Sequence, residues 1–176
     1  MTYQWIDYPD KYEAELENWC DEMVRRFAID NDTIMAEHLE AVDDYDHNFS
    51  YFCKIVLEGD KPVGLILVEV DEDPSKEFLT EDIVRIATFI VDPGLRNQGY
   101  GEKIIKDFMA NAPAIIQHDH NIFVSQVHKD NAIAQKFVNT LGFVLCETDD
   151  MEEEDWHNWV YPPTAVERYA ALWNSL

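Results

Sequence analysis

The sequence predicts an α/β fold with a mixed β-sheet, and three observations support this prediction. Apolar residues follow a helical spacing in roughly the first fifty residues and a strand-like pattern after them. Helices and strands then alternate along the chain. A glycine-rich loop connects one predicted strand directly to a helix. With 176 residues and 47% hydrophobic content, the chain is long enough to form one domain, residues 1–176, with a buried core.

The N-terminal segment, residues 1–50, is predicted to be helical. A second helix is expected from Ile34 to Val42, before a polar stretch. The first run of apolar residues at helical spacing comprises Leu16, Trp19, Cys20, Met23, Val24 and Phe27.

A meander of three strands is predicted next. The strands run from Tyr51 to Leu57, from Val63 to Val70 and from Ile83 to Val91. The segment Glu58-Gly59-Asp60-Lys61 supplies a turn between the first two. Gly64 inside the second strand predicts a bulge or a close approach of another part of the chain.

The second half alternates helices and strands. A helix with one apolar face is expected from about Gly99 to Asn111, and Gly142 is suited to end a later helix in the left-handed conformation. The other predicted elements are a strand Ile122 to Val127, a helix Asn131 to Leu141, strands Phe143 to Glu147 and Trp156 to Val160, and a helix Thr164 to Trp173.

The charge balance limits the partners that the protein can bind. Thirteen basic and 36 acidic residues give a net charge of −23, which opposes contact with nucleic acid or with an anionic membrane. The same charge favours cationic partners, or it serves only to keep the surface soluble. The acidic run Glu147–Asp155 between the last two strands is either a solvated loop or a segment that attracts cations.

The three cysteines, Cys20, Cys53 and Cys146, predict buried free thiols in a reducing compartment. They are far apart in the sequence, and an odd number argues against a disulfide framework. The N-terminus lacks the features of a signal peptide, and no apolar run approaches the roughly 20 residues that span a bilayer. We therefore expect a cytoplasmic protein.

No metal site is expected. The pattern Asp71-x-Asp73-x-Ser75 resembles the start of a calcium loop, but Lys76 occupies the position of the required glycine. The pair His118 and His120 has no third ligand nearby in the sequence, so a solvated loop explains it better.

The segment from Phe89 to Gly101 carries the strongest functional signal. A strand enters a tight loop, and Gly99 and Gly101 open the following helix. Glycines allow a ligand close to the backbone, and a helix N-terminus attracts anions, so the loop predicts phosphate binding. A Walker loop requires Lys after its last glycine, where Tyr100 stands here. A dinucleotide fingerprint requires a third glycine where Ile104 stands.

Two blocks of sequence resemble the GNAT superfamily of N-acetyltransferases. Arg96-x-x-Gly99-x-Gly101, following Val91-Asp92-Pro93, resembles the acyl-CoA loop of that family. Val127-x-x-x-Asn131-x-x-Ala134 followed by Leu141-Gly142-Phe143 is similar to its second block. The resemblance implies a mostly antiparallel mixed sheet with flanking helices, splayed between the central parallel strands. It also implies an acyl-CoA-binding core over residues 51–161, an acceptor-side segment over 1–50 and a C-terminal helix over 162–176.

The resemblance also implies a set of cofactor-binding residues. The backbone amides of the loop would hold the CoA pyrophosphate, and the backbone of Phe89 and Val91 would bond the pantetheine arm and the thioester carbonyl. Asn131 would contact the arm, or it caps its helix, or both. Phe137 would pack along the arm. The loop residues are Arg96, Asn97, Gln98, Gly99, Tyr100 and Gly101.

The usual acid and base of the family cannot be carried over. Val138 stands where many members have the tyrosine acid, and Arg85 stands where some have the glutamate base. Glu69 is a candidate base, although a cross-strand ion pair with Arg85 is the simpler explanation for it. His128 is a second candidate, and its alternative is a solvated loop residue. Tyr100 and Tyr161 cannot be ranked as acids from the sequence.

The implied activity is the transfer of an acetyl group from acetyl-CoA to a primary amine. The charge of the chain favours a cationic small molecule or peptide as the acceptor, and the amine would attack directly in a ternary complex. The missing acid and base leave an alternative open, a non-catalytic acyl-CoA-binding sensor or interaction module. The sequence does not fix the acceptor, the acyl length or the choice between monomer and homodimer.

Overall fold

The structure is a computed structural model that describes most of the chain. The described residues are 3–8, 11–29, 33–43, 49–71, 83–117, 122–147 and 155–173. Segments that the sequence analysis considered for metals, around Asp73 and around His118, lie outside these ranges, as do residues 148–154 of the acidic run.

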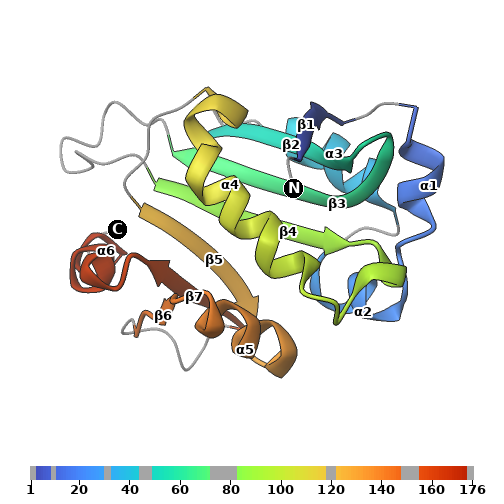
Figure 1. Ribbon diagram of the computed structural model, residues 1–176. Helices are drawn as coiled ribbons and strands as arrows, with labels where there is room; N and C mark the ends of the chain where they lie inside the picture. The colour runs from blue at the N-terminus through green and yellow to red at the C-terminus, as the bar shows by residue number, and fades with distance from the viewer. Residues whose placement is uncertain are drawn as a thin grey trace.

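The core of the fold is a seven-stranded sheet in the order β1-β2-β3-β4-β5-β7-β6 (Figure 1). Neighbouring strands are antiparallel except for β4 and β5, which are parallel. This confirms the predicted mixed sheet. The strands are β1 Gln4–Asp7, β2 Phe49–Glu58, β3 Lys61–Asp71, β4 Ile83–Val91, β5 Ile122–His128, β6 Val144–Leu145 and β7 Trp156–Tyr161.

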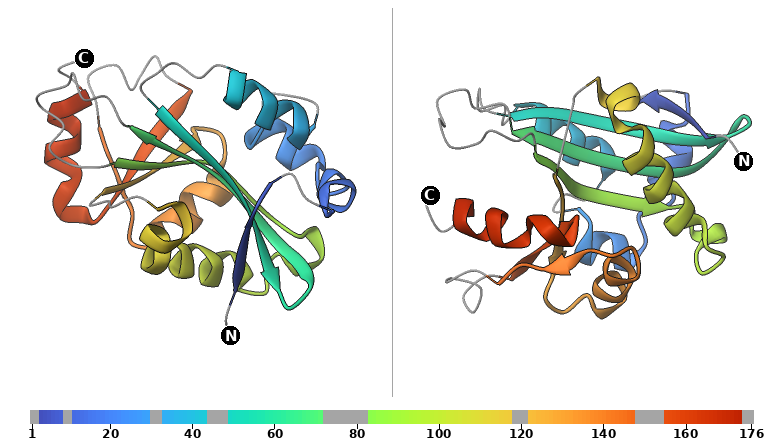
Figure 2. Two further views of the ribbon diagram at one scale, coloured as in Figure 1. Left: turned by 90° about the horizontal axis from the view of Figure 1, so that it is seen from above. Right: turned by 60° about the vertical axis from the view of Figure 1, so that its left-hand side comes forward.

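Helices cover both faces of the sheet (Figure 2). Helices α4 and α5 pack on one face, whereas α1 to α3 and α6 pack on the other. The helices are α1 Glu13–Glu17, α2 Glu22–Phe27, α3 Ile34–Asp43, α4 Tyr100–Ile116, α5 Ala132–Thr140 and α6 Val166–Trp173. Short 3₁₀ turns precede α4 at Pro93–Leu95 and α6 at Pro163–Ala165.

The N-terminal segment is not entirely helical, so that expectation was wrong at two points. Residues 4–7 form β1, an edge strand on β2 in which Trp5 pairs with Val56. The run of apolar residues from 16 to 27 belongs to two helices, because the side chain of Asp21 accepts a bond from Val24 N at 3.0 Å and begins α2 as its N-cap. Both features depend on contacts that apolar spacing alone does not reveal.

Two other elements differ in length from the prediction. Helix α4 continues through Pro113 to Ile116, because Ala112 and Ile116 extend its apolar face into the core. The strand expected from Phe143 to Glu147 is reduced to Val144–Leu145, since only these two residues pair with β7. Gly64 is a point of close approach as predicted, because a Cβ there would lie 3.0 Å from Ile104 Cδ1.

The three cysteines are buried and carry free thiols, as expected. Cys20 and Cys53 belong to the apolar cluster beneath α1 to α3, and Cys146 belongs to the cluster beneath α6. Burial raises the pKa of all three thiols, and for Cys53 it raises the pKa to about 12.

Within the described ranges, none of the helices is both long and apolar enough to cross a lipid bilayer.

Candidate active site

The parallel strands β4 and β5 separate partway along their length. They pair from Ile83 and Ile122 as far as Ile86 and Ser125, and the register ends there. On the other edge of β4, Thr88 pairs with Leu67 and Ile86 pairs with Val68, so Ala87 is an extra residue that forms a bulge. The bulge coincides with the point where β4 leaves β5, and the second half of β4 borders an opening.

The backbone of β4 presents polar groups to this opening. Asp92 N donates to Val63 O of β3 at 3.2 Å, so the backbone groups of Ile90 and Asp92 point toward β3. Because successive residues of a strand bond to opposite sides, those of Phe89 and Val91 point toward the opening. Arg96 Nε donates to the carbonyl of Val91 at 3.2 Å, which fixes the loop to the end of the strand.

The loop after β4 turns the backbone sharply into α4. Gly99 caps α4 with a φ of +81°, and Asn97 also has a positive φ, +61°. Gln98 Nε2 donates to Gly94 O at 2.7 Å, and Tyr100 donates its hydroxyl hydrogen to Glu58 Oε2 at 2.9 Å. That bond to Glu58 and partial desolvation raise the pKa of Tyr100. Because the Tyr100 hydroxyl already donates its hydrogen to Glu58, Tyr100 is poorly placed to donate a proton as a general acid.

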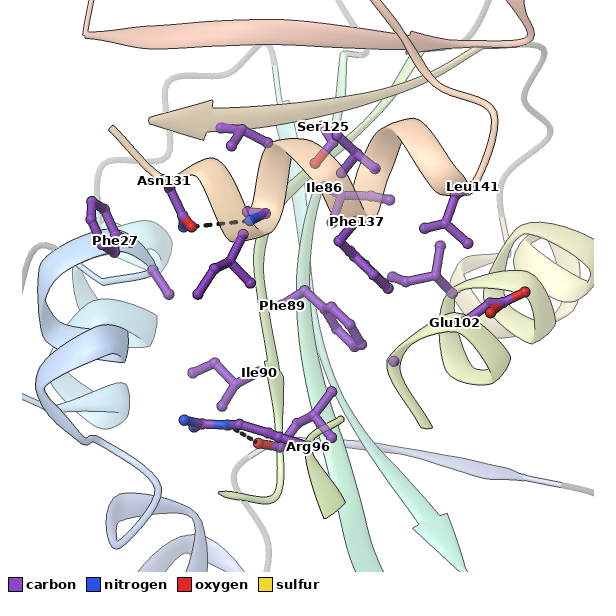
Figure 3. A pocket seen from close by; sticks show the side chains of 18 of the residues that line it. Phe27, Ile86, Phe89, Ile90, Arg96, Glu102, Ser125, Asn131, Phe137 and Leu141 are labelled. Atoms are coloured by element: carbon purple, nitrogen blue, oxygen red, sulfur yellow. Dashed lines mark hydrogen bonds between the residues drawn. The ribbon is translucent and has the colours of Figure 1, made fainter. Parts of the chain in front are cut away.

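A cavity of about 460 Å³ lies in the opening between β4 and β5 (Figure 3). Its walls come from β4, the loop, α4, β5, α5 and α2. Of the ten residues that the sequence analysis assigned to CoA, all but Gln98 and Tyr100 line it. Those lining the cavity are Phe89, Val91, Arg96, Asn97, Gly99, Gly101, Asn131 and Phe137.

The wall between α4 and α5 is aromatic. The rings of Phe89 and Phe137 stack with centroids 6.2 Å apart and an interplanar angle of 15°. A Cβ at Gly101 would lie 3.3 Å from the Phe137 ring, so glycine permits this approach of the two helices. Asn131 Oδ1 accepts from Ala134 N at 3.0 Å, which confirms the capping role while the side chain lines the cavity (Figure 3).

Helix α2 forms another wall, which the sequence analysis did not assign. Its residues Met23, Val24 and Phe27 line the cavity, as does Ala28 just after it. Asp21 at its start forms an ion pair with Arg96 of the loop. Burial raises the pKa of Asp21, but the bonds from Val24 N and Arg96 outweigh this and place the pKa below its ordinary value. The charged pair therefore persists at neutral pH and is lost only as acid protonates the carboxylate.

The other end of α2 is tethered to β4 by a buried hydroxyl. Thr88 Oγ1 donates to the carbonyl of Ala28 at 2.7 Å, and Thr88 is 6% exposed. We expect Thr88→Val to lower the free energy of unfolding by about 1–3 kcal/mol, because the carbonyl loses its partner. Thr88→Ser keeps the hydroxyl and is the control. Thermal unfolding tests this prediction, and equal melting temperatures of all three proteins would contradict it.

A second cavity, of about 470 Å³, adjoins the first. Ala28, Ala87 and Gln126 line both cavities, so the two meet at the bulge of β4. The residues that line only the second cavity are Ile29, Glu37, Glu69, Thr88, Trp156 and Trp173. Of these, only Glu69 was predicted from the sequence as a site residue.

Glu69 lies in this second cavity and forms the expected ion pair with Arg85. Arg85 Nη1 lies 3.1 Å from Glu69 Oε2, and the hydroxyl of Tyr51 donates to Glu69 Oε1 at 3.1 Å. Burial by itself lowers the pKa of Arg85, but its interactions with the Tyr169 hydroxyl and the Glu69 carboxylate outweigh the effect of burial and raise that pKa. Arg85 is therefore a stable positive charge beside Glu69.

His128 lines neither cavity but lies close to both. Its ring packs between Phe27 of the first cavity, at 5.5 Å, and Trp156 of the second, at 5.3 Å. Its Nδ1 accepts from Asp130 N at 3.1 Å, so the neutral ring carries its proton on Nε2. In this tautomer neither nitrogen is free to accept a proton from a substrate.

Several solved structures share this fold at low sequence identity. An aminoglycoside acetyltransferase, AAC(6')-Ib, in complex with paromomycin and acetyl-CoA is 15% identical, with a TM-score of 0.68 over 96% of this chain and 97% of that one. A spermidine N-acetyltransferase from Vibrio cholerae is 14% identical, with a TM-score of 0.59 over 90% and 92%. Naa50 from Arabidopsis thaliana, with the bisubstrate analogue CoA-Ac-MVNAL, is 16% identical, with a TM-score of 0.56 over 91% and 98%.

No curated protein sequence matches the chain at a significant level. The profile of the acetyltransferase (GNAT) family does match, over residues 5–143. The matched region includes the loop from Arg96 to Gly101, Asn131 and Phe143, so it covers both blocks of sequence that suggested this resemblance. The chain belongs to the GNAT family of acetyltransferases.

Proposed function

We propose that the protein transfers the acetyl group of acetyl-CoA to a primary amine by direct attack in a ternary complex. The observation that carries this proposal is the meeting of the two cavities at Ala28, Ala87 and Gln126. One cavity is lined by eight of the ten residues expected to bind CoA, and the other would hold an acceptor beside the thioester. The structures of similar fold act on or bind an aminoglycoside, spermidine and a peptide analogue, all of them amines or peptides.

The first cavity would hold acetyl-CoA. The amides at the start of α4 and the positive end of the helix dipole suit the pyrophosphate. The backbone of Phe89 and the amide of Val91 point into the opening and can bond the pantetheine amides and the thioester carbonyl. A donor aimed at that carbonyl oxygen stabilises the negative charge that develops on it.

The second cavity would hold the amine, with its nitrogen at the junction near Ala87. The nitrogen lone pair attacks the thioester carbon, the C–S bond breaks, and CoA leaves as a thiolate. A thiol with a pKa near about 8.5 is a good leaving group without a strong acid. Ser125 is 8% exposed, lines the first cavity and is the β5 member of the last β4–β5 pair, so its hydroxyl can donate a hydrogen bond to the sulfur.

We assign the proton of the attacking amine to Glu69, through water in the second cavity. Each oxygen of Glu69 accepts one bond, from Tyr51 or Arg85, and a carboxylate offers about four lone-pair sites in all. A water can therefore donate to Glu69 and pass the proton on. His128 fits this role less well, because its Nδ1 already accepts from Asp130 N.

Initial-rate kinetics test the proposed function. The protein is incubated with acetyl-CoA and a panel of monoamines, diamines, aminoglycosides and peptides, and free CoA thiol is measured. Direct attack predicts intersecting double-reciprocal lines and no acetylated protein after incubation with acetyl-CoA alone. CoA binding with no thiol release for any amine would contradict the proposal and favour the non-catalytic sensor.

A further inference from the structure

We propose that the second cavity binds a dicationic acceptor, a flexible amine that carries a second ammonium group away from the reacting nitrogen, as a linear diamine does. The identity of the reaction rests on the proposed function, but the binding of such a ligand does not. The inference comes from the chemistry of the residues that line this cavity and from their placement relative to the junction.

Three residues that line only the second cavity are suited to hold a cation. Trp156 of β7 and Trp173 of α6 line the second cavity and not the first, and so does Glu37 of α3. Indole rings attract ammonium groups through their faces, and a nearby carboxylate adds to that attraction. The set thus combines two aromatic side chains and one acid from three elements far apart in the sequence.

The second ammonium group must stay charged to bind these residues, whereas the reacting nitrogen must be neutral to attack the thioester. An acid beside it would favour its protonated form. At the junction the shared residues are Ala28, Ala87 and Gln126, none of which is charged. The charge of Glu69 is balanced by Arg85 at 3.1 Å. A ligand with two amino groups satisfies both requirements, because one stays charged near Glu37 while the other loses its proton at the junction.

The second cavity also has apolar lining that suits an alkyl spacer. Ala28 and Ala87 contribute it at the junction, and Ile29 contributes it in the part that belongs to the second cavity alone.

Calorimetric titration of the CoA-loaded protein tests this inference without requiring turnover. Putrescine and n-butylamine have the same carbon chain but two and one amino groups. We expect putrescine to bind at least about tenfold more tightly. Glu37→Gln, Trp173→Leu and Trp156→Leu should each reduce that ratio by about threefold or more. Glu167→Gln is the matched control, because it makes the same change in net charge at an exposed position of α6 that lines neither cavity.

The outcomes separate this inference from the proposed function. Equal affinity for the two amines would overturn it, even if both amines are acetylated. A preference that survives in Glu37→Gln and both tryptophan variants would overturn it too, since the charge of the whole molecule would then explain the preference. Selective binding of putrescine that depends on these residues, without acetyl transfer to any amine, would support the site and reject the proposed reaction. If one variant does not fold, as judged by circular dichroism, the remaining two decide.

Discussion

Replacing Gly99 with valine is expected to weaken CoA binding by roughly 10²–10⁴-fold. Gly99 caps α4 with a φ of +81°, a conformation that a β-branched residue avoids. Relaxation of this strain turns the neighbouring amides away from the pyrophosphate. Each hydrogen bond to a charged group contributes about 1.5–3 kcal/mol, so the loss of two gives the stated range. Calorimetric titration with CoA measures the effect.

The turn between β2 and β3 offers a matched control. Gly59 has a φ of +64°, and a Cβ at either Gly59 or Gly99 would have no atom within 4 Å. Gly59→Val therefore introduces similar backbone strain at a site that lines neither cavity. Both variants should lose stability, and only Gly99→Val should lose CoA affinity. An unchanged dissociation constant in a folded Gly99→Val protein would show that the loop does not hold the pyrophosphate.

Glu69→Gln is expected to lower kcat at neutral pH by about 10²–10⁴-fold, with CoA affinity retained. Without the carboxylate, the variant depends on amine that is already neutral. An alkylamine has a pKa near about 10.4, so kcat of the variant should rise about tenfold per pH unit across the neutral range. The wild-type rate should level off at a lower pH. Measurements of kcat from pH 6 to 10 reveal this difference in shape.

His128→Gln provides the comparison for this prediction. It removes another titratable group near the second cavity and should leave kcat within about threefold, since the ring already accepts a bond from Asp130 N. Loss of the Glu69–Arg85 pair will also lower the melting temperature of Glu69→Gln. Normal turnover combined with that lower melting temperature would assign Glu69 to the ion pair alone.

The sheet from β2 onward and the conformation of the glycine-rich loop before α4 could be predicted because their signals are local. Strand Ile83–Val91 is apolar at all positions except Arg85 and Thr88, and its observed bounds equal the predicted ones. Gly99 and Gly101 follow the end of that strand within ten residues, so their spacing in the sequence is enough to predict a tight loop there. The splay follows from the family resemblance, and the β4–β5 register, which stops at Ser125, confirms it.

The second cavity could not be predicted, because its residues meet only in the folded chain. Glu37 lies in α3, Trp156 in β7 and Trp173 in α6, and these elements are too far apart in the sequence for a short motif to include them. The N-terminal strand β1 has four residues and owes its conformation to pairing with β2. The sequence could not decide between Glu69 and His128 as the proton acceptor for a related reason. The choice depends on which groups bond to each side chain, Tyr51 and Arg85 for Glu69 and Asp130 N for His128, and these bonds are seen only in the folded structure.

The buried thiols make the two sides of the splay separately observable. Cys20 and Cys53 lie in the cluster on the β2–β4 side, and Cys146 lies in the cluster on the β5–β7 side. A thiolate is the reactive form, and burial keeps these groups protonated and shielded, so alkylation requires a transient opening of the surrounding layer. The rate of alkylation at each cysteine is thus a measure of how often its side opens. A ligand that bridges the strands would slow labelling on both sides, whereas one confined to one side would slow only that one.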